Sequence, residues 1–377
     1  MNATQHHWTP AHGWQPTLPG AQGAQLVLLF GATERLRDGE RVAEAARAWP
    51  NADVIGCSTA GEIQGDQVAE DGVVATALRF EHTRVRTVER LLPRAEDSET
   101  VGRALARELD EDDLVHVLVL AEGVHVNGSA LVRGLTEALP EGVQASGGLA
   151  ADGERFDTTL LVTRAGVKPG CVLAVGLYGS RIRVGYGSLG GWDPFGPERL
   201  ITHAKGNVLY ALDGRSALGL YKRYLGDYAA ELPASGLLFP LSLRDAEGGT
   251  GIVRTILSVD EQQQSLTFAG DMPEGGYARL MRANFDRLID GAQGAAETSR
   301  IGLRDAPVDV ALLISCVGRK MVLQQRVEEE IEGVREVFGP DCLLTGFYSY
   351  GEIAPFAPDA GCALHNQTMT VTTLSEA

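Results

Sequence analysis

Residues 346–353 read Gly-Phe-Tyr-Ser-Tyr-Gly-Glu-Ile, and this stretch interrupts the buried strand that the apolar Leu343 and Leu344 indicate. Glycines at a strand end let the backbone adopt positive φ or approach another group closely. A second strand is expected across residues 364–369, Leu-His-Asn-Gln-Thr-Met. The sequence therefore predicts a turn at one end of a sheet, with polar side chains gathered around it.

The same pattern occurs twice more. Residues 56–63, Gly-Cys-Ser-Thr-Ala-Gly-Glu-Ile, match residues 346–353 at both glycines, the glutamate and the isoleucine. Residues 146–152 form a looser copy when Ser146 is aligned with Gly56. An apolar strand and an amphipathic helix precede each copy: strands at 25–31, 114–120 and 310–315, and helices at roughly 34–48, 129–139 and 321–338. We therefore expect a mixed α/β fold, in which duplicated strand-helix-strand units form two related sheet-containing halves.

A chain of 377 residues is long enough for two domains. The first 23 residues contain scattered Pro, Gly and Gln, and we expect a flexible N-terminal arm there. Hairpin signals followed by a helix near Arg215 place the boundary between an N-terminal domain at 24–215 and a C-terminal domain at 216–377. Residues 277–294 are expected to be helical.

Composition excludes several classes of partner. The formal net charge of −17 argues against nucleic acid and anionic membranes, because both bind basic patches. The five cysteines lack paired spacing, so free thiols in a reducing, cytoplasmic compartment are expected. No run of about 18 apolar residues indicates a transmembrane helix.

The C-terminal copy concentrates groups that could bind a small ligand. Arg319 could hold a carboxylate bidentately, and Glu352 could accept an ammonium group, which together suit an amino acid. The predicted site consists of Ser315, Arg319, Tyr348, Tyr350, Glu352, His365 and Asn366. Two alternatives remain open at this stage: Arg319 and Glu352 could pair with each other, and the chain could be a scaffold without a ligand.

The N-terminal half adds residues that could close the pocket, namely Cys57, Ser58 and Glu62. Asn127 precedes a predicted helix whose first amides, near Ser129, could receive an anionic group. An enzyme that uses the Cys57/Ser58 turn or His365 is a further alternative. It is disfavoured because the turn is not Gly-x-Ser-x-Gly and the histidines lack metal-ligand spacing.

Many ordered motifs together resemble the FIST sensory domain, N-terminal and C-terminal halves included, across about residues 25–374. They are residues 55–63, Gly191-Trp192-x-Pro194-x-Gly196, Gly206-Asn207, Leu212-Asp213-Gly214, Ala217-Leu218-x-x-Tyr221-x-x-Tyr224-Leu225-Gly226, Ser315-Cys316-x-x-Arg319, residues 346–353 and residues 364–369. One departure is His125, which stands where the pattern favours a small or polar residue, so no family role is carried onto it.

The resemblance implies a bacterial, cytoplasmic signal-input module, without catalytic activity, that binds an amino-acid-like ligand. A branch of the family resembles haem-containing nitric-oxide sensors, and in that alternative His365, or else His203, would ligate the haem iron. The sequence shows no kinase, cyclase or methyl-accepting segment. The expected partner is therefore a separate histidine kinase or cyclic-dinucleotide enzyme.

Overall fold

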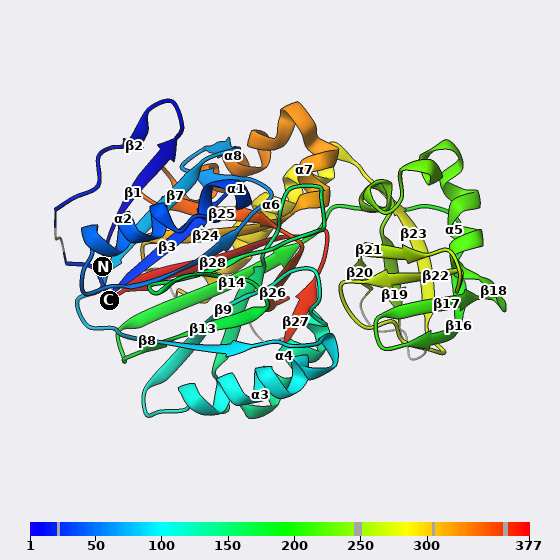
Figure 1. Cartoon of the computed structure of the whole chain (residues 1–377), viewed down its shortest axis with the longest axis horizontal. Helices are drawn as coiled ribbons and strands as arrows, with labels where there is room; N and C mark the ends of the chain where they lie inside the picture. The colour runs from blue at the N-terminus through cyan, green and yellow to red at the C-terminus, as the bar shows by residue number, and fades with distance from the viewer. Residues whose placement is uncertain (21–22, 245–250, 304–305, 357–360) are drawn as a thin grey trace.

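The computed structural model describes residues 1–20, 23–244, 251–303, 306–356 and 361–377. The chain forms a larger α/β body, which contains both termini, and a smaller β-rich subdomain formed between residues 193 and 282 (Figure 1). The predicted mixed α/β class is therefore confirmed. No helix within the described ranges is long and apolar enough to cross a membrane.

The larger body consists of three copies of one strand-helix-strand unit. In each copy two parallel strands are joined by a helical segment, and a later strand pairs antiparallel with the first of them. The copies are β3 (Leu26–Gly31), α1 (Thr33–Leu36), α2 (Glu40–Ala48), β4 (Asp53–Ser58) and β7 (Val73–Arg79); β9 (Leu114–Ala121), α4 (Gly128–Ala138), β10 (Gln144–Leu149) and β13 (Cys171–Tyr178); and β24 (Val310–Cys316), α7 (Val317–Leu323), α8 (Val327–Phe338), β25 (Leu343–Ser349) and β28 (Met369–Glu376).

An outer strand precedes each copy and pairs with its antiparallel strand. These outer strands are β1 (Asn2–Thr9), which also pairs with β2 (Gly13–Gln15), then β8 (Arg84–Leu91) and β14 (Ile182–Leu189). Helix α3 (Ser98–Leu109) follows β8, and α6 (Phe285–Ile301) follows β14 after the inserted subdomain. The three strand-helix-strand units expected from the sequence are therefore present, with the subdomain inserted before the third.

The copies are tied together by a cyclic exchange of hairpins. The hairpin that follows the second parallel strand of each copy pairs with the second parallel strand of another copy: β5–β6 with β25, β26–β27 with β10, and β11–β12 with β4. The hairpin strands are β5 (Glu62–Gln64), β6 (Gln67–Ala69), β11 (Leu161–Thr163), β12 (Gly166–Lys168), β26 (Gly351–Pro355) and β27 (Cys362–His365). Each sheet thus depends on a neighbouring copy.

A glycine in each second parallel strand allows this packing. A Cβ atom at Gly56, Gly147 or Gly346 would lie 1.7–1.8 Å from a carbonyl oxygen of the facing first strand, a distance that no side chain tolerates. These three glycines are therefore equivalent, and the alignment that placed Ser146 opposite Gly56 was shifted by one residue. Asp152 consequently falls at the position of Gly61 and Gly351. Its carboxylate instead accepts backbone N–H groups from residues 156–158.

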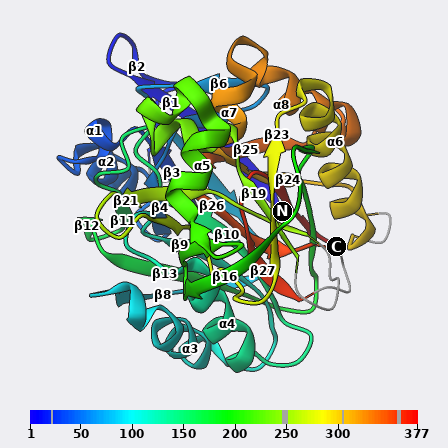
Figure 2. The same cartoon turned by 90° about the vertical axis from the view of Figure 1, so that its right-hand side faces the viewer.

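The three sheets face a common apolar core, and helices cover their outer faces. Alternate strand residues, such as Leu28, Leu120 and Ile314, point into the central core. Helix α2, the α3–α4 pair and the α6–α8 pair lie on three separate sides of the body (Figure 2). The carboxyl ends of the parallel strands β3, β4, β10 and β24 are thereby left uncovered by these helices.

The inserted subdomain has its own apolar core. Its elements are β15 (Asp193–Pro194), β16 (Arg199–Lys205), β17 (Val208–Leu212), β18 (Arg215–Ser216), α5 (Ala217–Leu225), the 3₁₀ helices η2 (Gly226–Glu231) and η3 (Ala234–Leu238), β19 (Leu241–Arg244), β20 (Ile252–Arg254), β21 (Ile256–Asp260), β22 (Ser265–Phe268) and β23 (Tyr277–Arg282). The predicted domain boundary near Arg215 lies inside this subdomain, because β17 pairs with β18 across it.

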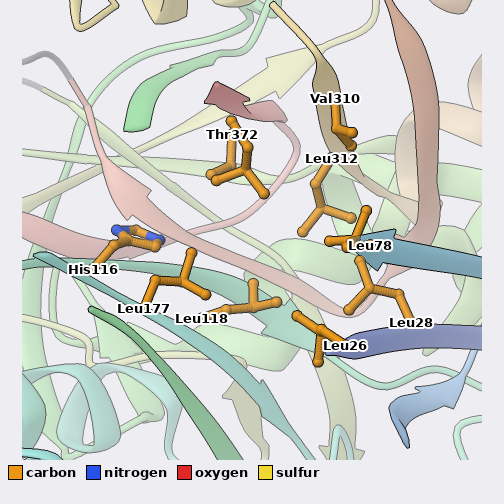
Figure 3. Close-up of a pocket in the computed structure, with 10 residues that line it drawn as sticks. Leu26, Leu28, Leu78, His116, Leu118, Leu177, Val310, Leu312 and Thr372 are labelled. Carbon is orange, nitrogen blue, oxygen red and sulfur yellow. The ribbon is translucent and has the colours of Figure 1, made fainter. Parts of the chain in front are cut away.

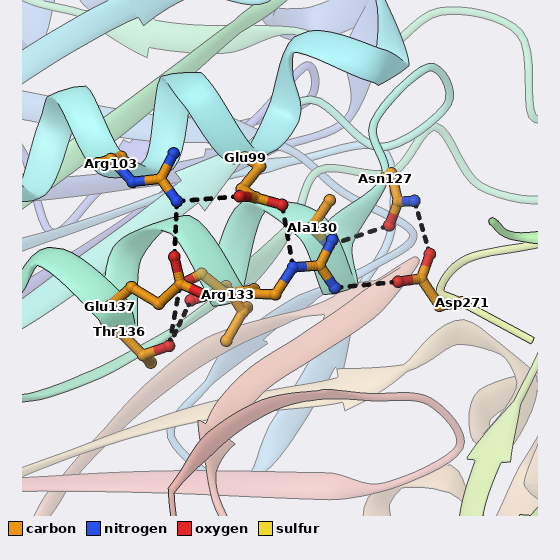
Figure 4. A network of polar contacts seen from close by, with 9 residues as sticks. Glu99, Arg103, Asn127, Ala130, Arg133, Thr136, Glu137 and Asp271 are labelled. Carbon is orange, nitrogen blue, oxygen red and sulfur yellow. Dashed lines mark hydrogen bonds and ion pairs between the residues drawn. The ribbon is translucent and has the colours of Figure 1, made fainter. Parts of the chain in front are cut away.

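Polar side chains join the subdomain to the body. Asp271 of the subdomain accepts hydrogen bonds from Asn127 Nδ2 at 2.8 Å and Arg133 Nη1 at 3.2 Å (Figure 4). Arg133 also contacts Glu99, so the network continues into α3. On the buried side, Arg254 donates to the carbonyl of Leu364 at 2.9 Å. Hydrogen bonds and ion pairs therefore hold the two bodies together.

Two local predictions are corrected by the structure. The arm expected to be flexible contains β1, which pairs with β7 from Asn2 to Trp8 because it satisfies the free backbone groups at that sheet edge. The expected helix at 277–294 begins only at Phe285, since residues 277–282 form β23 between β16 and β19. Asn284 caps the helix, and its side chain accepts the N–H of Arg287.

Candidate functional site

A groove lies at the carboxyl ends of the parallel strands, where all three copies meet. Its wide chamber, about 590 Å³, lies between Ala60, Gly153, Leu238 of η3, and α7 with the start of α8. Its narrow chamber, about 220 Å³, is lined by residues 32–34, 59–62 and 70–71 together with Arg155. Both chambers include Lys320, so we treat them as one site and call it the strand-end groove. Carboxyl ends of parallel strands are where α/β proteins usually bind ligands.

Lys320 is the central cation of the strand-end groove. It sits on α7, directly after β24, and its ammonium donates to the carbonyl of Ala60 at 2.7 Å and contacts Glu70 at 2.5 Å. Gly61 lets it approach, since a Cβ at that position would lie 3.2 Å from Nζ. The side chain is 19% exposed, so the charge is accessible from the groove but held in place by the protein.

Glu62 is the buried acid of the narrow chamber. Its Oε1 accepts a hydrogen bond from the Thr59 hydroxyl at 2.6 Å, whereas Oε2 is buried without a hydrogen-bond partner in the described part of the chain. Burial raises the pKa of Glu62 to about 8, although the Thr59 hydrogen bond, the charge of Lys320 and the backbone N–H groups of Gly72 and of Glu62 itself lower it in part. Glu62 therefore carries a proton in most molecules at neutral pH.

Three residues of the sequence-predicted site are gathered by a residue that the sequence did not single out. Glu330, on α8, accepts hydrogen bonds from Ser315 at 3.0 Å and from Tyr348 at 2.6 Å. Arg319 donates to the same carboxylate at 2.8 and 3.0 Å. Its other donors reach the carbonyls of Gly190 and Leu288, and the side chain is fully buried. This network occupies Arg319 inside the protein and leaves no open face for a ligand carboxylate.

The remaining residues of the C-terminal turn are also bonded internally. Glu352 accepts hydrogen bonds from Ser349 at 2.6 Å and from the amide and hydroxyl of Thr368 at 3.3 and 3.0 Å. Arg319 pairs with Glu330, so the alternative of an Arg319–Glu352 ion pair is not what the structure contains. Tyr350 donates to Asp152 and stacks on Phe156, and Asn366 donates to the carbonyl of Tyr350. None of these residues lines the strand-end groove.

The two histidines considered as haem ligands lie in different surroundings, and neither lines the strand-end groove. His365 is 5% exposed, and its Nε2 lies 2.9 Å from the carbonyl oxygen of Ala354. Burial lowers the pKa of its imidazole to about 4. His203 lies on the exposed side of the subdomain, with Nδ1 3.3 Å from Glu274. Across the described residues, no group of three or more His, Cys, Asp or Glu side chains could hold a metal ion.

Of the N-terminal residues predicted for the site, Glu62 lines the narrow chamber, whereas Cys57, Ser58 and Asn127 have structural roles. Cys57 is fully buried in the central core, and burial raises its thiol pKa, which disfavours a thiolate nucleophile. The Ser58 hydroxyl accepts the N–H of Leu160 at 2.9 Å. Asn127 caps α4 by accepting the N–H of Ala130. The anionic group expected near this helix terminus is supplied by the chain itself, as Asp271.

A second cavity lies on the central axis but is too small for a metabolite. It measures about 20 Å³, and it is lined by apolar strand residues such as Leu28, Leu118 and Leu312, with His116 at one side (Figure 3). His116 Nε2 lies 2.9 Å from the Ser146 hydroxyl, and burial lowers its pKa to about 3. Space of this size holds about one water molecule. We assign this cavity to core packing and not to ligand binding.

Comparison with known proteins covers nearly the whole chain. A model of the FIST N domain matches residues 25–215, and a model of the FIST C domain matches residues 217–355. The chain belongs to the FIST family. FIST domains are sensory ligand-binding domains, and membership gives this chain the same coarse function.

Two individual proteins are similar to this FIST chain. The uncharacterized protein MJ1623 of Methanocaldococcus jannaschii is 24% identical over 318 residues, which is 77% of this chain and 59% of that protein. The chain thus spans about three fifths of the length of this relative. Cyanuric acid hydrolase from A. caulinodans aligns with 100% of this chain and 99% of its own, at 9% identity and a TM-score of 0.37.

Sequence reasoning missed Lys320 and Glu330, which organise the groove and the buried network. Lys320 stands beside Arg319 just after a predicted strand, so the position at the strand end was a usable signal. Glu330 belongs to the run Glu328-Glu329-Glu330, a composition typical of a solvated helix face. Only the contacts that α8 makes with β24 and β25 reveal that Glu330, unlike a typical residue of such a run, is buried.

Proposed function

We propose that this chain is a sensory protein that binds an amino-acid-like ligand in the strand-end groove. The observation that carries the proposal is that one groove at the strand ends brings together an accessible ammonium, Lys320, and a buried carboxyl, Glu62. A zwitterionic ligand can place its carboxylate against Lys320 and its ammonium group against Glu62. The apolar side chains Leu238, Val317 and Met321 in the wide chamber supply a wall for a ligand side chain.

Signal output is proposed to pass to a separate histidine kinase or cyclic-dinucleotide enzyme. Support comes from the FIST family resemblance and from the position of Leu238. This residue belongs to the inserted subdomain yet lines the groove formed by the body, so a ligand there contacts both. A change in how the two bodies sit together is a signal that a partner can recognise.

Calorimetric titration with the proteinogenic amino acids tests the site. At least one is expected to bind the wild-type chain. Lys320→Ala should weaken it tenfold or more, because losing one partner of a charge contact costs about 2–5 kcal/mol. Lys222→Ala removes an ion pair with Glu261 on the far subdomain and should leave the affinity unchanged. Unchanged binding in Lys320→Ala would place the ligand elsewhere.

Three further variants separate the sequence-based alternatives from this site. If folded Arg319→Ala loses binding while Lys320→Ala keeps it, the site around Arg319 holds the ligand after all. Titration with haemin tests the haem alternative, which requires a Soret absorption band that is lost in His365→Ala or His203→Ala.

A further inference from the structure

Glu62 and its counterpart Glu352 differ in one respect that bears on ligand chemistry. Both follow equivalent turns, and each accepts a hydroxyl hydrogen bond of 2.6 Å from a residue three positions earlier, Thr59 or Ser349. Glu352 fills its second oxygen with the amide and hydroxyl of Thr368. Gly72, at the position of Thr368, has no hydroxyl, and its backbone N–H acts on the Glu62 carboxyl only enough to lower its pKa in part. The second oxygen of Glu62 is buried without a hydrogen bond of normal length among the described residues, and Glu62 lines the narrow chamber.

A buried carboxyl oxygen without a hydrogen-bond partner is costly whether or not it carries the proton, since a buried polar group without a hydrogen bond loses about 1–3 kcal/mol. Proteins seldom retain such a group where a simple neighbour, like Thr368 for Glu352, could fill it. The vacant position of Glu62 Oε2 is therefore best explained by a donor that arrives with a ligand.

The charges around the narrow chamber favour a cation as that donor. Acidic side chains in its lining outnumber basic ones: Glu34, Glu62, Glu70 and Asp71 against Lys320 and Arg155. Lys320 is paired with Glu70, and Arg155 lies 3.7 Å from Asp152, so neither cation is directed at Glu62 by a hydrogen bond. Asp71 is paired with Arg35 and Glu34 with Arg37. Glu62 remains the acid without a cationic partner at bonding distance.

We propose that the narrow chamber binds a protonated primary amine whose N–H group donates to Oε2 of Glu62. This proposal rests on the proposed function and assigns the ammonium end of the ligand to one residue. Because Glu62 is mostly protonated in the free protein at neutral pH, forming the ammonium–carboxylate pair releases its proton to the buffer. The charged and titratable groups around Glu62 are Lys320 from α7, Glu34 beyond β3, Glu70 and Asp71 before β7, Arg155 after β10 and the Cys57 thiol of β4.

Calorimetry with cadaverine, 1,5-pentanediol and L-lysine tests the proposal, because the first two differ only in amine and hydroxyl ends. Cadaverine should bind the wild-type chain at least tenfold tighter than pentanediol, with affinity rising between pH 6 and 8. Titrations in phosphate and Tris, which have different ionisation enthalpies, should show release of up to one proton. Glu62→Gln should lose tenfold or more of the affinity, whereas Glu352→Gln, the matched buried carboxyl outside the groove, should retain it.

Equal binding of cadaverine and pentanediol, or wild-type affinity in Glu62→Gln, would overturn the assignment. Proton release is measured on the unmodified chain, so its absence overturns the assignment even if a variant fails to fold. If an amino acid binds through Lys320 but without dependence on Glu62, the proposed function stands and this inference fails. If no amine or amino acid binds, both fail.

Discussion

Three buried glutamates, Glu62, Glu330 and Glu352, show how partners decide the role of a residue. Glu330 is fully paired with Arg319 and two hydroxyls. Glu352 is satisfied by neutral donors, and burial raises its pKa to about 8. Glu62 has the same raised pKa, but one of its oxygens is buried without a hydrogen-bond partner among the described residues, and the residue lines the narrow chamber of the groove. The same type of side chain thus has three roles. Glu330 forms a structural ion pair, Glu352 is a structural acid bonded to neutral donors, and Glu62 is a candidate ligand contact.

Glu330→Ala is expected to destabilise the chain by about 3–5 kcal/mol, because Arg319 would remain buried without its counter-ion. Arg94→Ala, which removes an exposed pair with Asp97, should cost less than about 1 kcal/mol. Urea unfolding of both variants provides the measurement. If Glu330→Ala lowers the free energy of unfolding by no more than Arg94→Ala does, the buried network around Glu330 contributes little to stability.

Stability should fall as pH rises from about 7 to 8, whereas between about pH 5 and 6.5 the buried neutral His116 and His365, whose pKa values burial lowers to about 3 and 4, offset the effect of the glutamates. The folded-state pKa of Glu62 and of Glu352, about 8, lies above the unfolded value near 4.5, so these two carboxyls bind more protons in the folded chain in the window from about pH 7 to 8. Each group contributes a slope of up to about −1.4 kcal/mol per pH unit. Glu62→Gln should remove the contribution of Glu62 and so reduce the slope of the free energy of unfolding against pH, as measured by urea unfolding. An unchanged slope would mean that Glu62 is ionised in the folded state.

The sequence could predict which residue types cluster at the C-terminal turn, but not which of their atoms remain open. Arg319 and Tyr348 were recognised as close together, and both do meet on one carboxylate. Their partner Glu330 lies on a helix whose composition looks solvent-exposed, so the pattern pointed to an external ligand. Whether a polar residue binds a ligand or a neighbour is decided by packing, which spacing alone does not give.

At the scale of elements, the repeat was visible because its glycines are required by close strand contact. The parallel strands, their helices and the shared turn all followed from the pattern. The hairpin exchange did not, because each hairpin pairs with a strand far away in sequence. Strand β1 was also missed, since its polar, partly exposed residues carry a weak strand signal.

Gly346→Ala is expected to disrupt the pairing of β24 and β25 severely. Its Cβ would lie 1.8 Å from the Leu313 carbonyl oxygen, so the strands must separate, and the β5–β6 hairpin paired with β25 would shift with them. Gly23→Ala, where no atom lies within 4 Å, is the matched control and should leave the melting temperature unchanged. Similar melting temperatures for the two variants would contradict the role given to the repeated glycine.

At the scale of the whole molecule, the inserted subdomain joins the body through both polar contacts and apolar packing. Its junction contains hydrogen bonds and ion pairs around Asp271 and Arg254. In addition, Leu237, Leu257 and Ala269 pack into the apolar core of the body. Inter-domain contacts with a large polar share usually permit relative motion. The junction is also incompletely satisfied, because Arg254 Nε and Gln367 Oε1 are buried without hydrogen-bond partners among the described residues. A modest change in binding energy is therefore able to shift this contact.

Asp271→Ala and Arg254→Ala should both loosen the subdomain without unfolding the body. Asp271 holds the start of α4 through Asn127 and Arg133, while Arg254 holds β27 through the Leu364 carbonyl. Hydrogen–deuterium exchange should therefore speed up at the start of α4 in the first variant and at β27 in the second. Exchange in the central strand β24 should stay at the wild-type rate, since its partners lie wholly within the body. Lys222→Ala, an exposed change on α5, serves as the control. If exchange at α4 and β27 matches that control, the junction is held by packing rather than by these polar contacts, and the subdomain is not the moving part.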